Sequence, residues 1–366
     1  MRPARLVLGP AAAALLGAAP APDTAPPCPG PRLAAGAEIA GPTLLLDTNF
    51  PDPFVARFGG RYYGYATGRQ LEARAANVQV VRSRDLVRWS APAEALPTRN
   101  LPAWADKADP QVWAPEAMRV GRRYVLYFNA RHATLTRTES PPGGPQVLKR
   151  HCLGAAVSTR PEGPFVGTGR PLACAAFQDG AIDPSPFRDA DGRLYLYFKD
   201  DGNCCGRKSA IWGMRLSPDG LAPSERPVRL FENDQSPARH DDWEWRVVEA
   251  PTMVRRGGAY VLFYSGNYFG NKNYSVGYRR CAGPLGPCRD PGDNPILWSH
   301  PASPLIGPGH QSVLRDRGRD LLFFHAWNRD PDGREQPGVH KRCLYVSPLG
   351  WAGGRPHVAG GTPRDR

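Results

Sequence analysis

The chain has 366 residues, of which 41% are apolar and 22% charged, and it holds 40 glycines and 41 prolines. This composition excludes a disordered chain or a coiled coil, and it favours short strands joined by many turns. The formal net charge is +13, but all except six of the 47 basic residues are arginines scattered along the chain. Because no basic block alternates with stacking aromatics, we expect no nucleic-acid partner.

The N-terminal residues have the pattern of a secretory signal peptide. Arg2 and Arg5 are followed by an apolar run from Leu6 to Ala19 and then by small residues, the order typical of an exported chain. The run is too short to span a membrane. We therefore predict a signal peptide at 1–22, a Pro/Ala-rich linker at 23–40, and a secreted, soluble monomer without membrane contact.

Eight cysteines in an exported chain indicate disulfide bonds. None of them stands at the CxxC spacing of a zinc site. Cys281 and Cys288 flank a Gly-Pro turn, so we expect a local bridge between them. The adjacent residues Cys204 and Cys205 are expected to bond to different partners, and the remaining pairings stay open.

From residue 41 onward one pattern occurs five times: a small or acidic residue, an apolar strand, a tight turn, and an aromatic-rich strand. The copies begin at Asp52, Ala114, Asp183, Ala250 and His310. Each copy reads as a hairpin, and the 60 or so residues per period leave room for two further strands.

Repeats of four strands at this spacing describe a β-propeller. We predict an all-β domain over 41–360 with five blades, each a four-stranded antiparallel sheet, around a central channel. The apolar runs show little alternation, because stacked blades bury both faces of a strand. Leu344 to Val358 is expected to form the closing outer strand.

The residues that open the first strands carry the candidate chemistry. In a propeller these strands line the channel, so Asp52, Asp183, Glu249 and His310 are expected to meet at one end of it. Carboxyl groups buried together must separate their pKa values, which lets one act as a base and another as an acid at the same pH. Glycoside hydrolysis with inversion needs such a pair, set about 6.5–9.5 Å apart to admit a water molecule.

Five phrases at these positions resemble glycoside hydrolase family 43, and the resemblance runs from about Leu44 to Val358. They are Phe50-Pro51-Asp52-Pro53, Trp113-Ala114-Pro115, Ala181-Ile182-Asp183-Pro184, Val248-Glu249-Ala250-Pro251 and Gly307-Pro308-Gly309-His310. The family usually has glycine after the acidic residue of the fourth phrase, where this chain has Ala250.

The resemblance implies roles for the carboxyl groups and the histidine. Asp52 would be the general base that holds the water, and Glu249 the general acid. Asp183 would tune the pKa of Glu249 and orient it. His310 would hold an ion or a water cluster at the channel centre, the ion often being calcium in arabinan-cleaving relatives, and no organic cofactor is expected.

The resemblance also implies the substrate contacts. Phe50 and Trp113 would form a platform for the sugar, and Ser185 and Arg342 would bind the substrate. The expected activity is inverting hydrolysis of plant-wall glycans that contain arabinose or xylose, foremost their α-L-arabinofuranosyl linkages. A β-xylosidase or a galactanase of the same family is the first alternative, and a sugar-binding propeller without activity is the second. Endo and exo action stay open.

Overall fold

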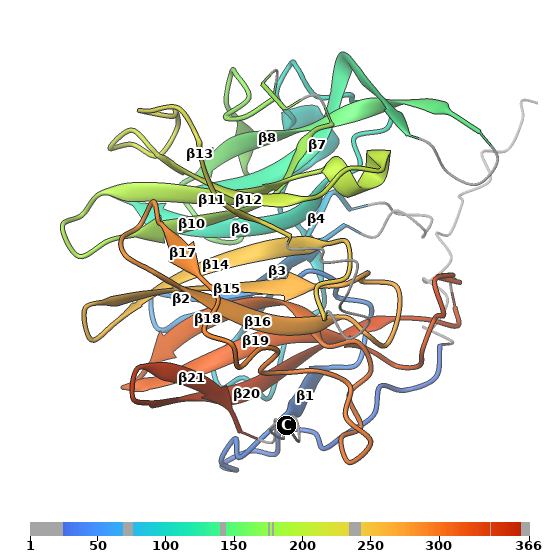
Figure 1. Cartoon of the computed structure of the whole chain (residues 1–366), viewed down its shortest axis with the longest axis vertical. Coiled ribbons are helices and arrows are strands. Elements are labelled where there is room, and N and C mark those ends of the chain that lie inside the picture. The colour runs from blue at the N-terminus through green and yellow to red at the C-terminus, as the bar shows by residue number, and fades with distance from the viewer. Residues whose placement is uncertain are drawn as a thin grey trace, which may run out of the picture.

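The computed structural model describes residues 25–68, 76–139, 144–174, 176–177, 179–233, 243–336 and 338–359. These residues form 21 strands and two short 3₁₀ helices, η1 (Thr98–Asn100) and η2 (Gly202–Cys205), and they contain no α-helix (Figure 1). The predicted signal peptide at 1–22 lies outside the described residues. No helix within them has the length and apolarity needed to cross a membrane.

Four sheets follow one another along the chain, and each contains four antiparallel strands in sequential order. Numbered as blades one to four, they consist of β2 (Phe54–Phe58), β3 (Arg61–Thr67), β4 (Val78–Ser83) and β5 (Ala93–Glu94); β6 (Trp113–Val120), β7 (Arg123–Glu139), β8 (Gln146–Ser158) and β9 (Val166–Gly167); β10 (Ala181–Arg188), β11 (Leu194–Asp200), β12 (Ala210–Arg215) and β13 (Val228–Glu232); and β14 (Val248–Arg256), β15 (Ala259–Gly266), β16 (Ser275–Cys281) and β17 (Cys288–Arg289).

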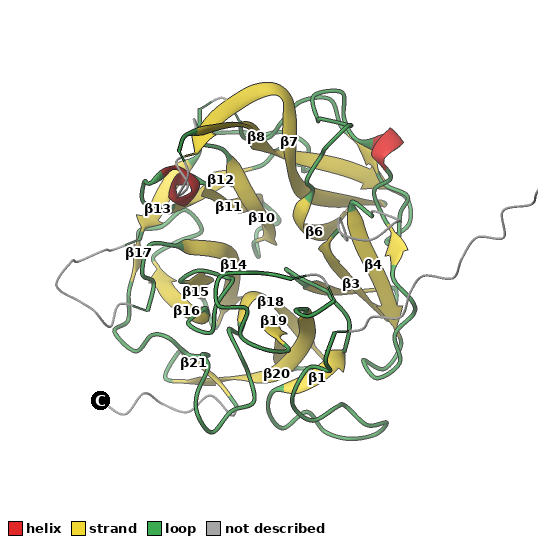
Figure 2. Ribbon diagram, turned by 90° about the vertical axis from the view of Figure 1, so that its right-hand side faces the viewer, coloured by secondary structure: helices red, strands yellow, loops and turns green. Residues whose placement is uncertain are grey.

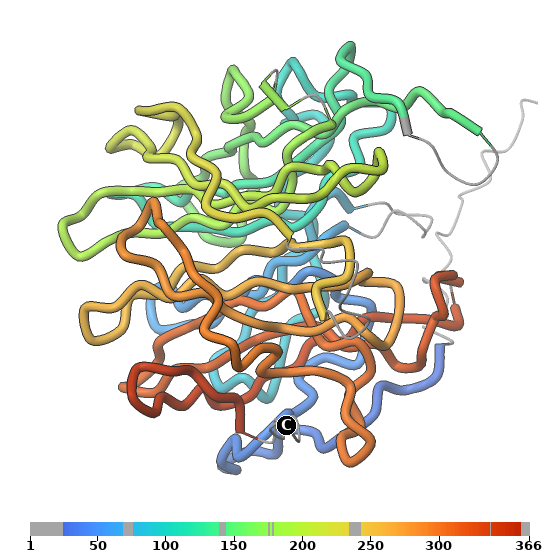
Figure 3. The backbone as a smooth tube through the Cα atoms, viewed as in Figure 1, coloured from blue at the N-terminus to red at the C-terminus, as the bar shows by residue number. Residues whose placement is uncertain are grey.

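Blade five joins the two ends of the chain. Its strands run in the order β1 (Thr43–Leu46), β20 (Arg342–Ala352), β19 (Arg319–Trp327) and β18 (Gly309–Asp316), and β21 (Arg355–Val358) pairs with β20. The segment expected to close the ring as one outer strand instead forms most of β20 and all of β21, and the N-terminal strand β1 completes the blade. Figure 2 shows the five sheets around a central axis, and Figure 3 shows the blue N-terminal and red C-terminal segments on the same side. The predicted five-bladed propeller is confirmed.

The hydrophobic core consists of five clusters, one between each pair of neighbouring blades. Successive residues of one strand belong to different clusters: Leu321 and Phe323 pack toward blade one, whereas Leu322 and Phe324 pack toward blade four. Both faces of the inner strands are thus buried, which explains the missing alternation in the sequence. Burying each such side chain stabilises the fold by about 1.5–3 kcal/mol.

Four disulfides cross-link the chain: Cys28–Cys343, Cys152–Cys174, Cys204–Cys205 and Cys281–Cys288. The local Cys281–Cys288 bridge is confirmed. The expectation that Cys204 and Cys205 take different partners is wrong, because they bond to each other in η2 and the other six cysteines are already paired.

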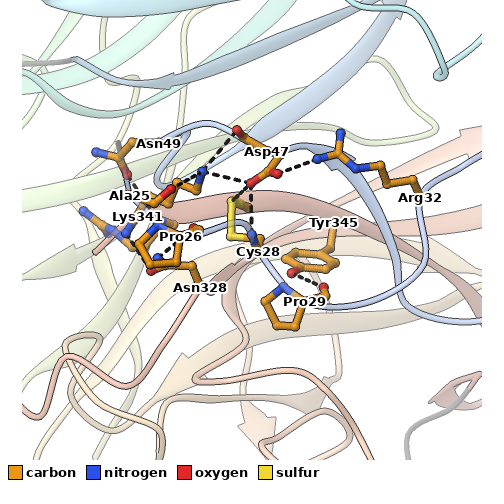
Figure 4. Close-up of a disulfide and its surroundings, with 12 residues drawn as sticks. Ala25, Pro26, Cys28, Pro29, Arg32, Asp47, Asn49, Asn328, Lys341 and Tyr345 are labelled. Atoms are coloured by element: carbon orange, nitrogen blue, oxygen red, sulfur yellow. Dashed lines mark hydrogen bonds and ion pairs between the residues drawn. A yellow bond between two sulfur atoms is a disulfide. The ribbon is translucent and has the colours of Figure 1, made fainter. Parts of the chain in front are cut away.

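The segment before β1 is attached to the propeller. Besides the Cys28–Cys343 disulfide, Asp47 accepts a hydrogen bond from the Cys28 amide (3.0 Å) and pairs with Lys341 (3.0 Å) (Figure 4). Asn328 donates to the Pro26 carbonyl oxygen at 3.0 Å. These contacts fix the N-terminal segment against the residues that enter β20.

Candidate active site

Each blade begins with a non-glycine residue in the left-handed backbone region. These residues and their φ angles are Asp52 (55°), Ala114 (44°), Asp183 (55°), Ala250 (52°) and His310 (50°). In blades two to five the register between the first and second strands shifts at this point, as in a β-bulge that redirects a side chain. Such a conformation costs about 1–3 kcal/mol per residue and is characteristic of binding and catalytic sites. It also accounts for glycine at the family position that Ala250 occupies.

Four of these five residues donate their backbone N–H to a side chain on the second strand of the preceding blade. The pairs are Asp52 to His325 Nδ1 (3.1 Å), Ala114 to Thr67 Oγ1 (2.8 Å), Asp183 to Asn129 Oδ1 (3.4 Å) and His310 to Ser265 Oγ (2.8 Å). The five-fold repeat therefore includes a hydrogen bond between blades as well as the strand pattern.

The junction between blades three and four breaks this rule. The equivalent side chain on β11 is Lys199, which pairs with Ile182 in the sheet and can only donate hydrogen bonds. The Ala250 N–H bonds instead to Asp183 Oδ2 at 3.0 Å. Lys199 turns to Glu249, with Nζ 2.9 Å from Oε2. The break in the repeat thus occurs where two of the candidate carboxyl groups lie.

Asp52 is surrounded by positive and polar groups. Its Oδ1 accepts a hydrogen bond from Arg342 Nη1 at 2.9 Å and lies 3.4 Å from His310 Nδ1, and its Oδ2 accepts from Thr67 Oγ1 at 2.6 Å. Burial by itself would raise the pKa of this carboxyl, but the Arg342 charge, the neighbouring His310 and the Thr67 hydrogen bond outweigh it and hold the pKa of Asp52 well below its usual range. Asp52 is therefore ionised at any pH of interest.

His325 stays neutral beneath Asp52. Its side chain is completely buried, and burial together with the nearby Arg342 lowers its pKa well below the ordinary value. Because its Nδ1 accepts the Asp52 N–H, the ring proton belongs on Nε2. His325 thus fixes the backbone of Asp52.

Glu249 is held by two donors of different kinds. The Tyr274 hydroxyl donates to Oε1 at 2.7 Å, and Lys199 donates to Oε2 at 2.9 Å. The Lys199 side chain is only 1% exposed, and on its other side lies Asp201, 3.9 Å from Nζ. Arg137 pairs with the same Asp201, so a buried chain of alternating charges ends on Glu249.

Asp183 interacts electrostatically with both of the other carboxyl groups, Glu249 and Asp52. Burial, with repulsion from Glu249 and Asp52, raises its pKa to about 6, although His310 and Lys199 act in the opposite direction. Asp52 and Asp183 therefore titrate far apart, which is the separation that acid–base chemistry at one pH requires.

All three carboxyl groups border one cavity of about 610 Å³, a size typical of small-ligand sites. The predicted residues Trp113, His310 and Arg342 also line it. Trp113 is half-buried, and its ring centroid lies 3.9 Å from that of His151. Of the eight predicted site residues, the structure brings six together at this cavity: Asp52, Asp183, Glu249, Trp113, His310 and Arg342.

Phe50 and Ser185 are not part of this cavity, which corrects the prediction for both. The Phe50 ring is completely buried in the core cluster between blades one and five, beside Gly64 and Val81. Ser185 is 3% exposed and bonds to the buried Glu116. Phe50 therefore belongs to the core, and Ser185, two residues beyond Asp183, is buried against Glu116.

The predicted calcium ion finds few ligands among the described residues. Calcium takes six to eight oxygen ligands, but His310 belongs to no group of three or more His, Cys, Asp or Glu side chains close enough to share an ion. Within the described part of the chain the one such group, Cys28, Asp47 and Cys343, contains a disulfide. The donor set around His310 therefore does not suit calcium held by side chains, and the chemistry below uses no metal.

Several cavity residues were missed by the sequence reasoning. Lys199 stands near the end of the aromatic strand β11 and looks like a strand-end charge. Tyr274, which bonds to Glu249 but does not line the cavity, lies in a loop. Tyr268 and Phe269 line the cavity from the same loop, and the Phe269 ring lies 4.9 Å from the Arg342 guanidinium. The signal for Lys199 was available in the repeat, because it alone is a donor where the other blades have acceptors.

Comparison with known proteins places this geometry in a family. The sequence profile described as "Glycosyl hydrolases family 43" matches residues 44–356. A β-D-galactofuranosidase from Aspergillus niger is 27% identical, over 75% of this chain and 73% of its own length. An extracellular exo-α-(1→5)-L-arabinofuranosidase from Streptomyces chartreusis is also 27% identical, over 75% of this chain and 79% of its own.

Solved structures agree with the sequence comparison. The crystal structure of a thermostable family-43 glycoside hydrolase superimposes with a TM-score of 0.70 at 27% identity, covering 87% of this chain and 95% of the other. The profile match spans most of the chain, and it includes all five strand-opening residues. This chain is a glycosidase that belongs to glycosyl hydrolase family 43.

Proposed function

We propose that this protein is a secreted glycosidase that cleaves α-L-arabinofuranosyl linkages of plant-wall glycans with inversion at the anomeric carbon. One observation carries the proposal: a single cavity holds the ionised Asp52 on blade one and the donor-bound Glu249 on blade four, with Asp183 of raised pKa between them. A base and an acid carried by different blades around one cavity suit single displacement.

Asp52 acts as the general base. A water molecule between the sugar and Asp52 gives its proton to the carboxylate as its oxygen attacks the anomeric carbon. Arg342 and Thr67 hold both carboxylate oxygens, so the base points at one place throughout the step. Their hydrogen bonds keep Asp52 ionised before the attack.

Glu249 acts as the general acid and gives its proton to the leaving oxygen. Repulsion from Glu249 contributes to the raised pKa of Asp183, so Asp183 holds a proton at acidic pH. Lys199 and Tyr274 orient the Glu249 carboxyl toward the leaving group. After proton transfer, the Lys199 ammonium stabilises the carboxylate that remains.

The preference for arabinofuranosides rests on the relatives. The Streptomyces relative is named for arabinofuranose and the Aspergillus relative for galactofuranose, and the two furanosides differ by one exocyclic carbon. Two further observations support secretion: four disulfides suit an oxidising compartment, and the Streptomyces relative is named as extracellular.

The test is hydrolysis of a panel of aryl glycosides (α-L-arabinofuranoside, β-D-galactofuranoside, β-D-xyloside) and of linear arabinan, followed by anomeric proton NMR. We expect fastest turnover on the arabinofuranoside, a first product of inverted configuration, and loss of turnover in Asp52→Asn. A first product of retained configuration would refute the base role. Activity on the xyloside alone would refute the proposed preference for arabinofuranosides. Binding of arabinan without turnover would indicate a sugar-binding propeller.

A further inference from the structure

The turn that leads into β14 presents an unusual side chain. Trp245 is 49% exposed, and it is the one aromatic residue among the large exposed hydrophobic side chains of the described residues. It precedes Val247 by two residues and Glu249 by four, and both of these line the cavity. Because the first strand of every blade begins at the channel face that carries the cavity, Trp245 lies at that face, on the side of the general acid.

The backbone of Trp245 is strained. Its φ is 46°, a conformation that glycine or asparagine adopts easily and a bulky residue rarely adopts. Exposure of the indole to water is a second cost. A tryptophan that is both strained and exposed indicates a role in binding rather than in folding.

The residues around Trp245 are firmly anchored. The Trp243 ring packs 5.2 Å from the ring of Tyr264, and the buried Glu244 pairs with Arg279 at 3.1 Å. The Glu244 carbonyl oxygen accepts the Val247 N–H at 3.0 Å, which closes the turn. Trp245 is therefore presented outward by a rigid turn.

Two further contacts fix Trp245 itself. Asn233 Nδ2 donates to its carbonyl oxygen at 2.8 Å, which ties the turn to the end of β13. The Arg246 guanidinium lies over the indole, 5.5 Å from the ring centroid, at cation–π distance. The ring is thus oriented before any ligand arrives, which lowers the entropy cost of binding.

We propose that Trp245 is a stacking platform for a neutral sugar unit beyond the scissile bond, on the leaving-group side of Glu249. The apolar C–H face of a pyranose or furanose ring would pack on the indole, while its hydroxyls stay in water. This inference rests on the proposed function for the position of the leaving group. Trp245 would therefore contribute to the binding of glycan chains and little to the binding of short synthetic substrates.

The experiment compares kcat/KM on a linear arabinan oligosaccharide with kcat/KM on the aryl arabinofuranoside. In Trp245→Gly we expect the ratio of the two constants to fall about tenfold, the usual effect of removing one central aromatic contact. Glycine accepts the positive φ, so thermal stability should be equal to or higher than that of the wild type. Trp245→Phe should retain most of the ratio, and Val166→Ala, at an exposed apolar site on β9, serves as the control.

An unchanged ratio in Trp245→Gly would overturn the proposal, and so would an equal loss on both substrates, which would indicate an effect on Glu249. If the wild type cleaves neither substrate, the proposed function fails, and the platform is then tested by affinity electrophoresis in gels containing arabinan or arabinoxylan. Weaker retardation of Trp245→Gly than of the wild type would support the platform. Equal retardation, or none for either protein, would overturn it.

Discussion

Arg342→Met removes the guanidinium that keeps the proposed base ionised. Arg342 Nη1 lies 2.9 Å from Asp52 Oδ1, and the two side chains are only 11% and 13% exposed. The burial of Asp52 remains after the substitution, and of the neighbours that lower its pKa the main ones left are His310 and the Thr67 hydroxyl. We expect the pKa of Asp52 to rise toward the range where it limits activity.

The size of the change follows from the buried position. An arginine next to an aspartate lowers the aspartate pKa by about 1–3 units, so the acidic limb of kcat/KM should move upward by about that amount. Breaking a buried ion pair costs about 3–5 kcal/mol. In the wild type the lowered pKa of Asp52 stabilises the fold above its unfolded pKa, and this contribution is lost as pH falls. Since that loss occurs below the unfolded pKa of about 3.9, the stability deficit of the variant should be nearly constant from pH 7 to about pH 4 and shrink only at lower pH.

The assay measures kcat/KM on the aryl arabinofuranoside from pH 3 to 9, with thermal denaturation at the same pH values. Arg342→Lys keeps the charge and should restore part of the acidic limb. Arg57→Met is the matched control, because it removes another arginine–aspartate pair, with Asp316 at 3.2 Å, away from the cavity. An acidic limb that stays in place in Arg342→Met would refute the electrostatic role, whatever happens to stability.

Four other outcomes are expected. Glu249→Gln should lose most turnover on substrates with poor leaving groups and much less on activated aryl glycosides, measured as the dependence of kcat on leaving-group pKa; equal losses would contradict the acid role. Lys199→Met should also lose more turnover on substrates with poor leaving groups than on activated ones, but by less than Glu249→Gln. Lys199→Arg, which keeps the positive charge, should restore the turnover on poor leaving groups. Because burial raises the pKa of Asp183 to about 6, kcat/KM of the wild type should decline as pH rises through about 6, and Asp183→Asn should displace that limb. Cys28→Ser with Cys343→Ser opens a covalent loop that spans 315 residues, so unfolding in denaturant should show a loss of about 2–5 kcal/mol, and an unchanged midpoint would show that the bridge does not constrain the chain.

The sequence predicted the structure well wherever the five-fold repeat is visible in short local patterns, such as turns and strand starts. Turn glycines such as Gly59 and Gly60, with φ of 55° and 82°, mark the hairpins because few other residues adopt those angles. The positions of Asp52, Asp183 and His310 at the starts of strands followed from the period alone, since the first strand of every blade in a closed ring lines the same central channel. The blade count and three of the pocket residues needed no coordinates for this reason.

The predictions that were wrong concern residues whose direction the period does not set. Phe50 stands close to Asp52, yet the left-handed residue at Asp52 sends the two side chains to opposite sides, into the core and into the cavity. Cys204 and Cys205 pair because a 3₁₀ turn folds them together. The outer strand of blade five comes from the N-terminus, since β20 offers a free edge to β1.

By itself, the sequence determined the propeller architecture and the position of the three carboxyl groups at the central channel, because equivalent residues of each repeat occupy equivalent places around the axis of the ring. Only the tertiary structure decided the ionisation of Asp52 and Asp183. Arg342 contacts Asp52 from a position 290 residues away in the chain, and Lys199 meets Glu249 at the junction of blades three and four. The pKa of a buried group depends on charges within a few ångströms in space, and closure of the ring brings those charges together from opposite ends of the chain.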